Sequence, residues 1–374
     1  MKKLQQPKPD KTSTPDKIKQ LEEELSKTKY NKATQGHVGL VKAKIAMLKE
    51  KQERRSAGKG KQEGFQVRKT GDATVIMVGY PSVGKSTILN KVTNAHSKVA
   101  AYAFTTLTVI PGLLRYKGSD IQVLDVPGIL AGAAAGTGRG KEVLASAMGA
   151  DLVLFIVDAT QPENLVTLKK EVYEADLRIN ERKPFVVIEQ KPRGGVTVGS
   201  LVNLTKTDEE TIAAVAKEMK ILNASILIRD DITVDQFIDV VEGNKRYIPG
   251  IIVINKADLL SPVELERVKR EYLPDICISA ELGKGTEELK ELIFQKLRFL
   301  RVYCKEVGKK ADVQEPLILM EGATLQTMCE RLHRDFVKNF KFARIWGSSK
   351  FPGQEIRKLS YELKDGDVVE LHIR

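Results

Sequence analysis

The 374-residue chain has 61 Lys and Arg against 49 Asp and Glu, a net charge of +12, and 42% of its residues are hydrophobic. Its length suits two to four globular domains. No apolar run approaches the roughly 20 residues of a membrane-spanning helix, and no apolar core of a secretory signal follows the N-terminal lysines. Three cysteines and four histidines, all far apart, indicate neither a disulfide framework nor a structural metal site. We therefore expect a cytoplasmic protein that does not contact a membrane.

Residues 1–64 are predicted to form a basic helical hairpin followed by a connector. Apolar residues recur at helical spacing over 18–25 and 38–48, and "NKATQGHVG" between them indicates a turn. Residues 1–70 contain 19 Lys and Arg against 8 Asp and Glu, a net of +11. Such a charge run is often only a solvated face. Because it accompanies a helical pattern here, contact with a polyanion such as RNA is an equal alternative.

The middle of the chain indicates an α/β domain with an insertion. Residues 65–180 and 246–298 alternate apolar strands with helical segments, which predicts a parallel sheet. The expected strands are "ATVIMVG", "DIQVLDVPG", "DLVLFIVDAT", "GIIVINKAD" and "DICISA". Far more chain separates the third strand from the fourth than one crossover helix needs. We therefore predict that residues 181–245 form their own α+β unit.

Residues 299–374 indicate a small final domain. "EPLILM", "FARIW" and "DVVELHI" are typical of strands, and the last follows the turn "KDGD". One helix face is expected to carry Leu325, Met328, Leu332 and Phe336. This order of elements is typical of a β-grasp-like fold.

Residues 79–86, "GYPSVGKS", lie between a predicted strand and a predicted helix and match the phosphate-loop pattern G-x-x-x-x-G-K-[ST]. Glycine lets successive backbone amides point at phosphate oxygens, and the helix N-terminus adds its positive end. Lys85 should reach the β- and γ-phosphates, and Ser86 should ligate Mg²⁺. The nucleotide-binding residues predicted here are Gly79, Ser82, Val83, Gly84, Lys85, Ser86 and Thr87.

Two further segments predict the catalytic and metal-binding groups. Asp125 and Gly128 in "DVPG" fit D-x-x-G, in which the carboxylate holds Mg²⁺ and the glycine amide senses the γ-phosphate. In "YAFTTLT", Thr106 is the first candidate and Thr105 the second for a threonine that closes onto Mg²⁺ and the γ-phosphate; alternatively, these are β-branched residues entering a strand. The predicted catalytic set is Lys85, Thr106, Asp125 and Gly128, and the predicted metal ligands are Ser86, Thr106 and Asp125.

The segment that predicts which nucleotide base is bound is Asn255-Lys256-Ala257-Asp258, which follows an apolar strand. The Asp258 carboxylate can accept hydrogen bonds from the ring N–H and exocyclic amine of guanine, and adenine lacks both donors. Sites that depend on such hydrogen bonds discriminate by roughly 10⁴–10⁵. Ser279 and Ala280 in "ISAE" are the expected backbone contact to the base carbonyl. The predicted ligands are GTP and GDP with Mg²⁺, which argues against an ATP-dependent kinase or motor.

Together, "GYPSVGKST", "YAFTTLT", "DVPGILAGAAAGTGRG" and "NKAD" resemble the Obg group of GTPases, and most closely the developmentally regulated GTP-binding proteins. The resemblance covers essentially the whole chain. It implies a P-loop GTPase domain, an inserted unit like domain 2 of ribosomal protein S5, and a C-terminal TGS domain, to which "RIWG", "FPGQ" and "DGDVVELHI" are similar. It also implies work on ribosomes during translation with a protein partner.

Two positions bear on the hydrolysis rate. Ile129 follows D-x-x-G where many GTPases carry the glutamine that orients water, so slow intrinsic hydrolysis is predicted. The missing group would come from a monovalent cation, another residue or a partner. Relatives that use K⁺ typically have asparagine where this chain has Ser82. Gly132, Gly136, Gly138 and Gly140 predict a mobile switch loop.

The leading hypothesis is therefore a GTP-hydrolysing switch that binds the ribosome or RNA through its basic N-terminus and TGS-like domain. The alternative is a GTP-dependent protein-interaction module whose client is not the ribosome. In that case the N-terminal lysines are mainly solubilising.

Overall fold

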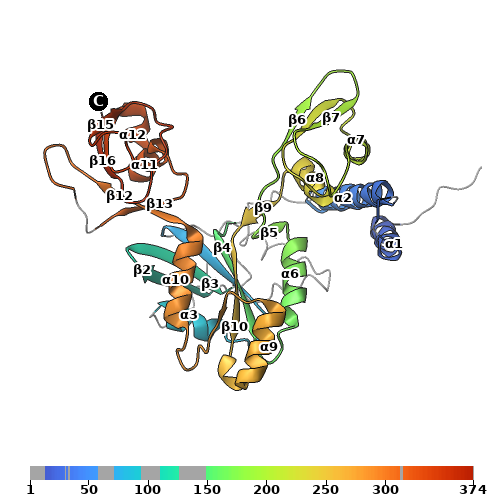
Figure 1. Cartoon of the computed structure of the whole chain (residues 1–374), viewed down its shortest axis with the longest axis horizontal. Coiled ribbons are helices and arrows are strands. Elements are labelled where there is room, and N and C mark those ends of the chain that lie inside the picture. Colours follow the sequence, from blue (N-terminus) through green and yellow to red (C-terminus); the bar gives the residue numbers. More distant parts are fainter. Residues whose placement is uncertain are drawn as a thin grey trace, which may run out of the picture. The chain divides into compact units, whose positions relative to one another are not determined.

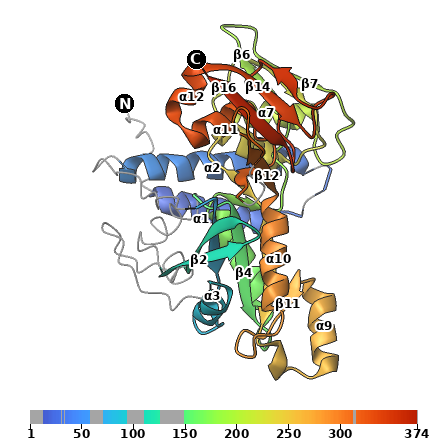
Figure 2. The same ribbon diagram turned by 90° about the vertical axis from the view of Figure 1, so that its left-hand side faces the viewer.

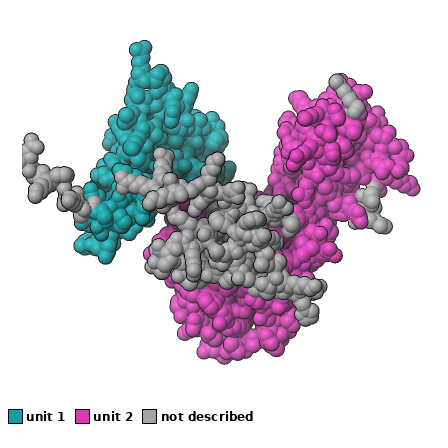
Figure 3. Space-filling view, turned by 180° about the vertical axis from the view of Figure 1, so that it is seen from behind, with its two compact units in different colours: residues 1–63, 182–246 teal, residues 64–181, 247–374 magenta. Residues whose placement is uncertain are grey.

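The computed structural model describes most of the chain, namely residues 13–29, 31–32, 34–57, 71–93, 110–125, 149–311 and 315–373. The chain forms two compact units, residues 1–63 with 182–246 and residues 64–181 with 247–374 (Figures 1 and 3). None of the described helices combines the length and apolar character needed to cross a membrane.

The second unit begins with a six-stranded sheet in the order β11-β10-β4-β1-β3-β2. All neighbouring pairs are parallel except β2 and β3. The elements of this part are β1 (Ala73–Val78), α3 (Lys85–Thr93), β2 (Ile110–Tyr116), β3 (Ser119–Asp125), β4 (Leu152–Asp158), α6 (Asn164–Glu174), β5 (Leu177–Ile179), β9 (Arg246–Ile248), β10 (Gly250–Asn255), a 3₁₀ turn (Ala257–Leu259), α9 (Pro262–Tyr272), β11 (Ile276–Cys277) and α10 (Thr286–Leu297).

Strand β2 is absent from the sequence prediction. It pairs antiparallel with β3, and the sheet order places it at an edge. Pro111 and Gly112 hide the strand pattern because both residues are disfavoured inside strands. An edge strand tolerates them, and Gly112 also allows a close approach to α3. A Cβ at that position would lie 2.6 Å from Cγ2 of Thr93.

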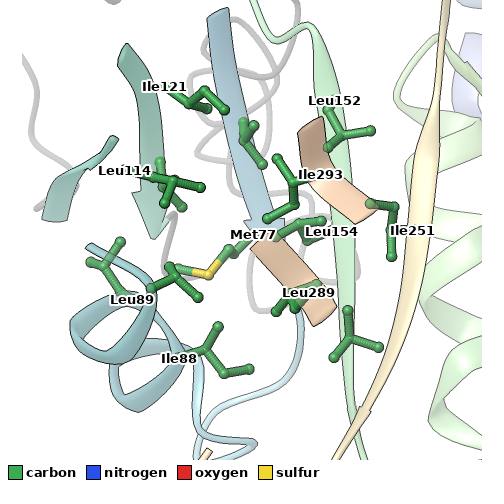
Figure 4. Packing of buried hydrophobic residues seen from close by; sticks show 14 of the residues in the cluster. Met77, Ile88, Leu89, Leu114, Ile121, Leu152, Leu154, Ile251, Leu289 and Ile293 are labelled. Carbon is green, nitrogen blue, oxygen red and sulfur yellow. The ribbon is translucent and has the colours of Figure 1, made fainter. Parts of the chain in front are cut away.

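The apolar strands are buried on both faces, as expected for a parallel sheet covered by helices. Every residue of β1 is buried. On one face Met77, Leu154 and Ile251 pack against Leu89 of α3 and Ile293 of α10 (Figure 4). On the other face the β4 and β10 side chains pack against α6 and α9. This packing holds the carboxyl ends of β1, β4 and β10 side by side, where ligands bind in open α/β sheets.

The second unit ends in a five-stranded sheet in the order β13-β12-β16-β14-β15, of which β12, β14 and β16 are labelled in Figure 2. Its elements are β12 (Phe299–Cys304), β13 (Leu317–Met320), α11 (Leu325–Leu332), α12 (Arg334–Asn339), β14 (Phe340–Trp346), β15 (Gln354–Ile356) and β16 (Val368–Ile373). The single helix predicted through Leu325 and Phe336 is wrong. His333 is extended (φ −162°, ψ 140°) and its Nδ1 accepts a hydrogen bond from the Asp335 amide, so α11 ends and α12 begins there.

The described part of the first unit contains a three-stranded sheet, β6-β8-β7, and four helices. The elements are α1 (Thr14–Lys27), α2 (Gln35–Ala57), β6 (Val186–Gln190), β7 (Val196–Ser200), α7 (Glu209–Glu218), β8 (Ala224–Ile228) and α8 (Val234–Glu242). Because α2 begins at Gln35, the turn is shorter than "NKATQGHVG" predicts. Ala43 of α2 lies in the same hydrophobic core as Val215 of α7 and Phe237 of α8. The N-terminal helices therefore share a core with the inserted strands and helices.

A glycine explains how closely α2 approaches α7. A Cβ at Gly39 would lie 3.1 Å from Cγ2 of Thr211 and 3.2 Å from a methyl group of Val215. Beside this contact, Lys42 forms an ion pair with Asp235 (2.5 Å), and the Gln35 amide donates to Asp208 (3.2 Å).

Candidate nucleotide-binding site

The phosphate loop lies between β1 and α3, as the sequence predicts. Its backbone has left-handed φ angles at Ser82 (64°) and Gly84 (93°). Such a backbone forms a concave surface of amides that can bind anions. Gly84 is required for a second reason, because a Cβ there would lie 2.4 Å from Nδ2 of Asn255. Gly79 also lies close to the sheet, and its Cβ would be 2.4 Å from the carbonyl oxygen of Ile156.

Lys85 is held inside the loop. Its side chain is 9% exposed, and Nζ donates hydrogen bonds to the carbonyl oxygens of Gly79 (2.9 Å) and Tyr80 (3.0 Å). Burial lowers the pKa of this ammonium group, and the nearby Asp125 carboxylate partly opposes that shift. A buried cation of this kind is stabilised by an anion bound beside it. This is the electrostatic environment that a phosphate group fits.

The predicted metal ligands Ser86 and Asp125 lie together. The Ser86 hydroxyl donates to Oδ2 of Asp125 (2.9 Å), and Asp125 is 4% exposed. Oδ1 of Asp125 is buried and has no hydrogen-bond partner among the residues that the structure describes. A hydroxyl beside a carboxylate oxygen that lacks a partner is a suitable pair of hard ligands for Mg²⁺. A bound Mg²⁺ would neutralise charge on the β- and γ-phosphates during hydrolysis.

Asn255 connects the two loops of the site. Its Nδ2 donates to the carbonyl oxygen of Val83 (2.9 Å), and its Oδ1 accepts from the amide of Ala280 (3.0 Å). Asn255 is 2% exposed, so both ends of the amide are used inside the protein. Val83 belongs to the phosphate loop and Ala280 to the predicted base loop. Asn255 thus fixes the distance between the phosphate and base subsites.

The remaining base-recognition residues surround a hollow of about 250 Å³. The residues that line it are Gly84, Thr87, Asn255, Lys256, Asp258, Leu259, Ser279, Ala280 and Glu281. Asp258 is exposed there, on the 3₁₀ turn after β10. Ser279 and Ala280 are buried, and their loop is closed by two backbone hydrogen bonds between Ser279 and Lys284, each 3.0 Å long. The structure therefore brings the predicted phosphate and base residues to one place.

Asp158, which was not predicted from the sequence as a site residue, belongs to this site. Its Oδ2 accepts from Nζ of Lys256 (2.7 Å), and its Oδ1 accepts from the amide (2.9 Å) and hydroxyl (2.7 Å) of Thr160. Burial alone would raise the pKa of the Asp158 carboxyl. These hydrogen bonds outweigh burial, so the pKa lies below its ordinary value. The carboxylate stays charged and holds Lys256, whose φ of 61° is left-handed. "VDAT" at the end of β4 was the signal available in the sequence.

Several predicted residues lie outside the described part of the chain. They are Thr105, Thr106, Gly128, Ile129, Gly132, Gly136, Gly138 and Gly140. Their predicted roles rest on the sequence alone.

The sheet order, the phosphate loop and the base-recognition loop define this chain as a P-loop GTPase. Residues 74–191 match the family described as "50S ribosome-binding GTPase", residues 193–299 match the "C-terminal region of MMR_HSR1 domain", and residues 301–373 match the TGS domain. The chain belongs to the family of developmentally regulated GTP-binding proteins. The predicted family and fold class are thereby confirmed, with GTP and GDP as the nucleotides.

The relatives match over nearly their whole length. An uncharacterized GTP-binding protein of Methanocaldococcus jannaschii is 50% identical over 364 residues, which cover 96% of this chain and 93% of the relative. Developmentally-regulated GTP-binding protein 2 of Homo sapiens is 40% identical over 359 residues, covering 95% of this chain and 98% of the relative. A crystal structure of a GTP-binding protein from Pyrococcus horikoshii aligns with 80% of this chain and 100% of its own, at 15% identity and a TM-score of 0.43.

Proposed function

We propose that this GTPase is a cytoplasmic molecular switch that acts on the ribosome in translation and hydrolyses GTP slowly without help. The observation that carries the proposal is the set of exposed lysines on the two N-terminal helices. They are Lys17, Lys19 and Lys27 on α1, and Lys44, Lys49 and Lys51 on α2. Cations spread over a helical surface suit the phosphate backbone of RNA. The matched family description, "50S ribosome-binding GTPase", points to the same partner.

The experiment is co-sedimentation with ribosomes from the organism that makes the protein. A nonhydrolysable GTP analogue is compared with GDP at two salt concentrations. A switch should be retained with the analogue and released with GDP, and salt should weaken binding because each phosphate contact releases counterions. Equal retention with both nucleotides would indicate that the lysines bind the ribosome only by nonspecific electrostatic attraction. No binding at either salt concentration would favour the protein-interaction alternative.

A matched pair of variants tests the lysines themselves. Replacing Lys19 and Lys27 with alanine removes two exposed charges from α1, and replacing Lys169 and Lys170 removes two exposed charges from α6. We expect the first variant to lower the slope of log affinity against log salt by about 1 per lysine. The α6 variant should leave the slope unchanged. If the two variants behave alike, the α1 lysines are not the ribosome contact.

Slow hydrolysis follows from the aliphatic side chain of Ile129, which cannot orient water by hydrogen bonding. A K⁺ ion near Ser82 is our candidate for the missing group, with a partner protein as a second source. Asparagine adopts left-handed φ angles more readily than most residues, so Ser82→Asn should fold normally. Single-turnover hydrolysis should be faster in KCl than in NaCl, and more so in Ser82→Asn. Equal rates in both salts for both proteins would exclude K⁺.

A further inference from the structure

The C-terminal sheet has an outer face that its hydrophobic core does not use. On β14, Phe342, Arg344 and Trp346 alternate with the buried residues Ala343 and Ile345. Alternate side chains of a strand point to opposite faces of the sheet. The inner face packs against Leu325 and Met328 of α11. Phe342, Arg344 and Trp346 therefore lie on the face opposite α11.

Phe342 forms the first aromatic position on this face. Its ring stacks on the imidazole of His372 on β16, with centroids 4.2 Å apart and planes 17° apart. Two cations flank the same ring, with Nζ of Lys341 at 5.9 Å and Cζ of Arg344 at 5.8 Å from its centroid. Phe342 is half-buried and takes no part in the core.

Trp346 forms the second position. Nζ of Lys305 lies 4.8 Å from its ring centroid, and Gly353 packs so closely that a Cβ there would lie 3.0 Å from Nε1 of Trp346. Gly353 belongs to the β14–β15 loop. That loop also carries Phe351, which is 60% exposed and has Nζ of Lys350 at 5.4 Å from its ring. Three aromatic side chains of this region thus each have a lysine or arginine within 6 Å.

A buried carboxylate holds these groups in place. The side chain of Glu370 on β16 is 3% exposed, forms ion pairs with Lys305 and with Arg344 (3.9 Å), and is hydrogen-bonded to Nε2 of His372 (2.8 Å). The hydrogen bond from Lys305, and then that from His372, lower the pKa of Glu370 although burial opposes them. At the β15 edge Glu355 is paired with Arg357 (2.8 Å). Glu370 and Glu355 are thus paired, and the cations are oriented before any ligand arrives.

We propose that this face binds single-stranded RNA, with an unpaired base stacked on Phe342, on the same face as Trp346, and phosphates contacting Lys341, Arg344 and Lys350. Partly exposed rings beside cations suit a chain whose bases are free to stack and whose backbone is anionic. Double-stranded RNA hides its base faces and would use only the cations. This assignment rests on the proposed ribosomal function and names the RNA surface within it.

Trp346 supplies a local test because it is the only tryptophan in the chain. Its fluorescence reports on this face even if the N-terminal lysines bind RNA elsewhere. Titration of the full-length protein with decauridylate should quench Trp346 and reach saturation. Phe342→Ala should weaken this binding about 5- to 150-fold, the effect of losing one base stack. Its emission spectrum without RNA should match that of the wild type, showing that the sheet is intact.

Two matched controls accompany this variant. Phe185→Ala removes a ring that is 49% exposed and also flanked by an arginine (Cζ of Arg229 at 4.6 Å), but in the other unit. Lys338→Ala removes an exposed lysine from α12 and is compared with Lys341→Ala. Both controls should bind decauridylate within twofold of the wild type, whereas Lys341→Ala should bind more weakly and with a smaller salt dependence.

Three results would overturn the proposal. One is an unchanged Trp346 signal while labelled decauridylate binds by anisotropy, which would place RNA elsewhere. Another is equal affinity for a ten-base-pair RNA duplex, which would indicate phosphate contacts without stacking. The third is quenching by polyglutamate and not by RNA, which would favour an acidic protein partner. Failure of the ribosomal function is a separate outcome, because the wild type would then quench with decauridylate but not sediment with ribosomes.

Discussion

Replacing Asn255 with alanine should disconnect the phosphate loop from the base loop. The side chain makes two buried hydrogen bonds, to the Val83 carbonyl (2.9 Å) and from the Ala280 amide (3.0 Å). Each bond contributes about 0.5–1.5 kcal/mol, and a buried group left without a partner costs about 1–3 kcal/mol. The hydrogen-bond and desolvation contributions describe the same two groups, so they are not simply added. The combined loss of free energy is about 2–4 kcal/mol. If nucleotide binding must restore the spacing, GDP affinity falls about 30- to 1,000-fold.

A comparison of GDP with IDP separates this connecting role from direct base contact. Hypoxanthine lacks the exocyclic amine of guanine, and both ends of the Asn255 amide are already bonded to protein. Asn255→Ala should therefore weaken GDP and IDP binding by the same factor, measured by calorimetry. Asp258→Ala should weaken GDP more than IDP, because the Asp258 carboxylate is the expected acceptor for that amine. A larger loss for GDP than for IDP in Asn255→Ala, or a loss below threefold, would refute the reasoning.

Three further perturbations follow from the contacts. Asp158→Ala releases Lys256 and should weaken GTP and GDP binding equally, by about tenfold, in titrations with each nucleotide. Glu291→Gln tests a carboxyl whose pKa the hydrogen bond from Lys117 helps to lower to about 2. A carboxyl whose pKa is lower in the folded than in the unfolded protein stabilises the fold at pH values above its unfolded-state pKa. This stabilisation is lost as the pH falls toward about 2. The difference in unfolding midpoint from the wild type should therefore be present at pH 6 and shrink below about pH 4.5. Gly39→Leu overfills the contact between α2 and α7 and should destabilise the fold by about 1–3 kcal/mol in urea unfolding.

Controls keep these three results specific. Asp158→Asn retains a hydrogen-bond acceptor for Lys256 and should lose less affinity than the alanine variant. A midpoint difference for Glu291→Gln that stays constant from pH 6 to pH 3 would contradict the assignment of its pKa. Gly36→Ala, where the nearest atom would be 3.8 Å away, should leave stability nearly unchanged. If Gly39→Leu is equally harmless, α2 does not pack as closely as the distances indicate.

The sequence predicted what depends on local pattern. The run from Val75 to Ser86 combines a buried strand, a turn with glycines and a helix start, and the structure has all three. Asp258 was found because a carboxylate after an apolar strand has a specific chemical use. Asn255 was predicted as a base-recognition residue, but its connection of the two loops was not predicted, since its two partners are 172 and 25 residues away. Asp158 was passed over for the same reason, with Lys256 lying 98 residues further along.

The association of α2 with the inserted strands could not be predicted for a different reason. Periodicity shows which face of a helix is apolar, but it does not identify the surface that covers that face. The residues of α2 that meet the insertion include Gly39 and Ala43, which are small and carry little hydrophobic signal. Close approach of helices uses such residues because they leave room for larger neighbours. The sequence therefore predicted a hairpin but not its partner.

The position of the insertion follows from the geometry of β10. Helix α6 already provides the crossover from β4, so the chain needs only to return to the start of β10. Strands β5 and β9 pair with each other, which brings the two ends of the insertion together and limits the entropic cost of the long excursion.

Asn180 then fixes the start of β10. Its side chain accepts from the Gly250 amide (2.8 Å) and donates to the Gly250 carbonyl (3.0 Å), and a Cβ at Gly250 would lie 2.3 Å from Ile179. At the other end of the same six-residue strand, Asn255 bonds to both loops of the nucleotide site. Both ends of β10 therefore control the register of this strand. A slip of one residue would turn Asn255 away from Val83 and Ala280. We therefore expect guanine recognition to depend on Asn180 at the start of β10 as well as on the base loop itself.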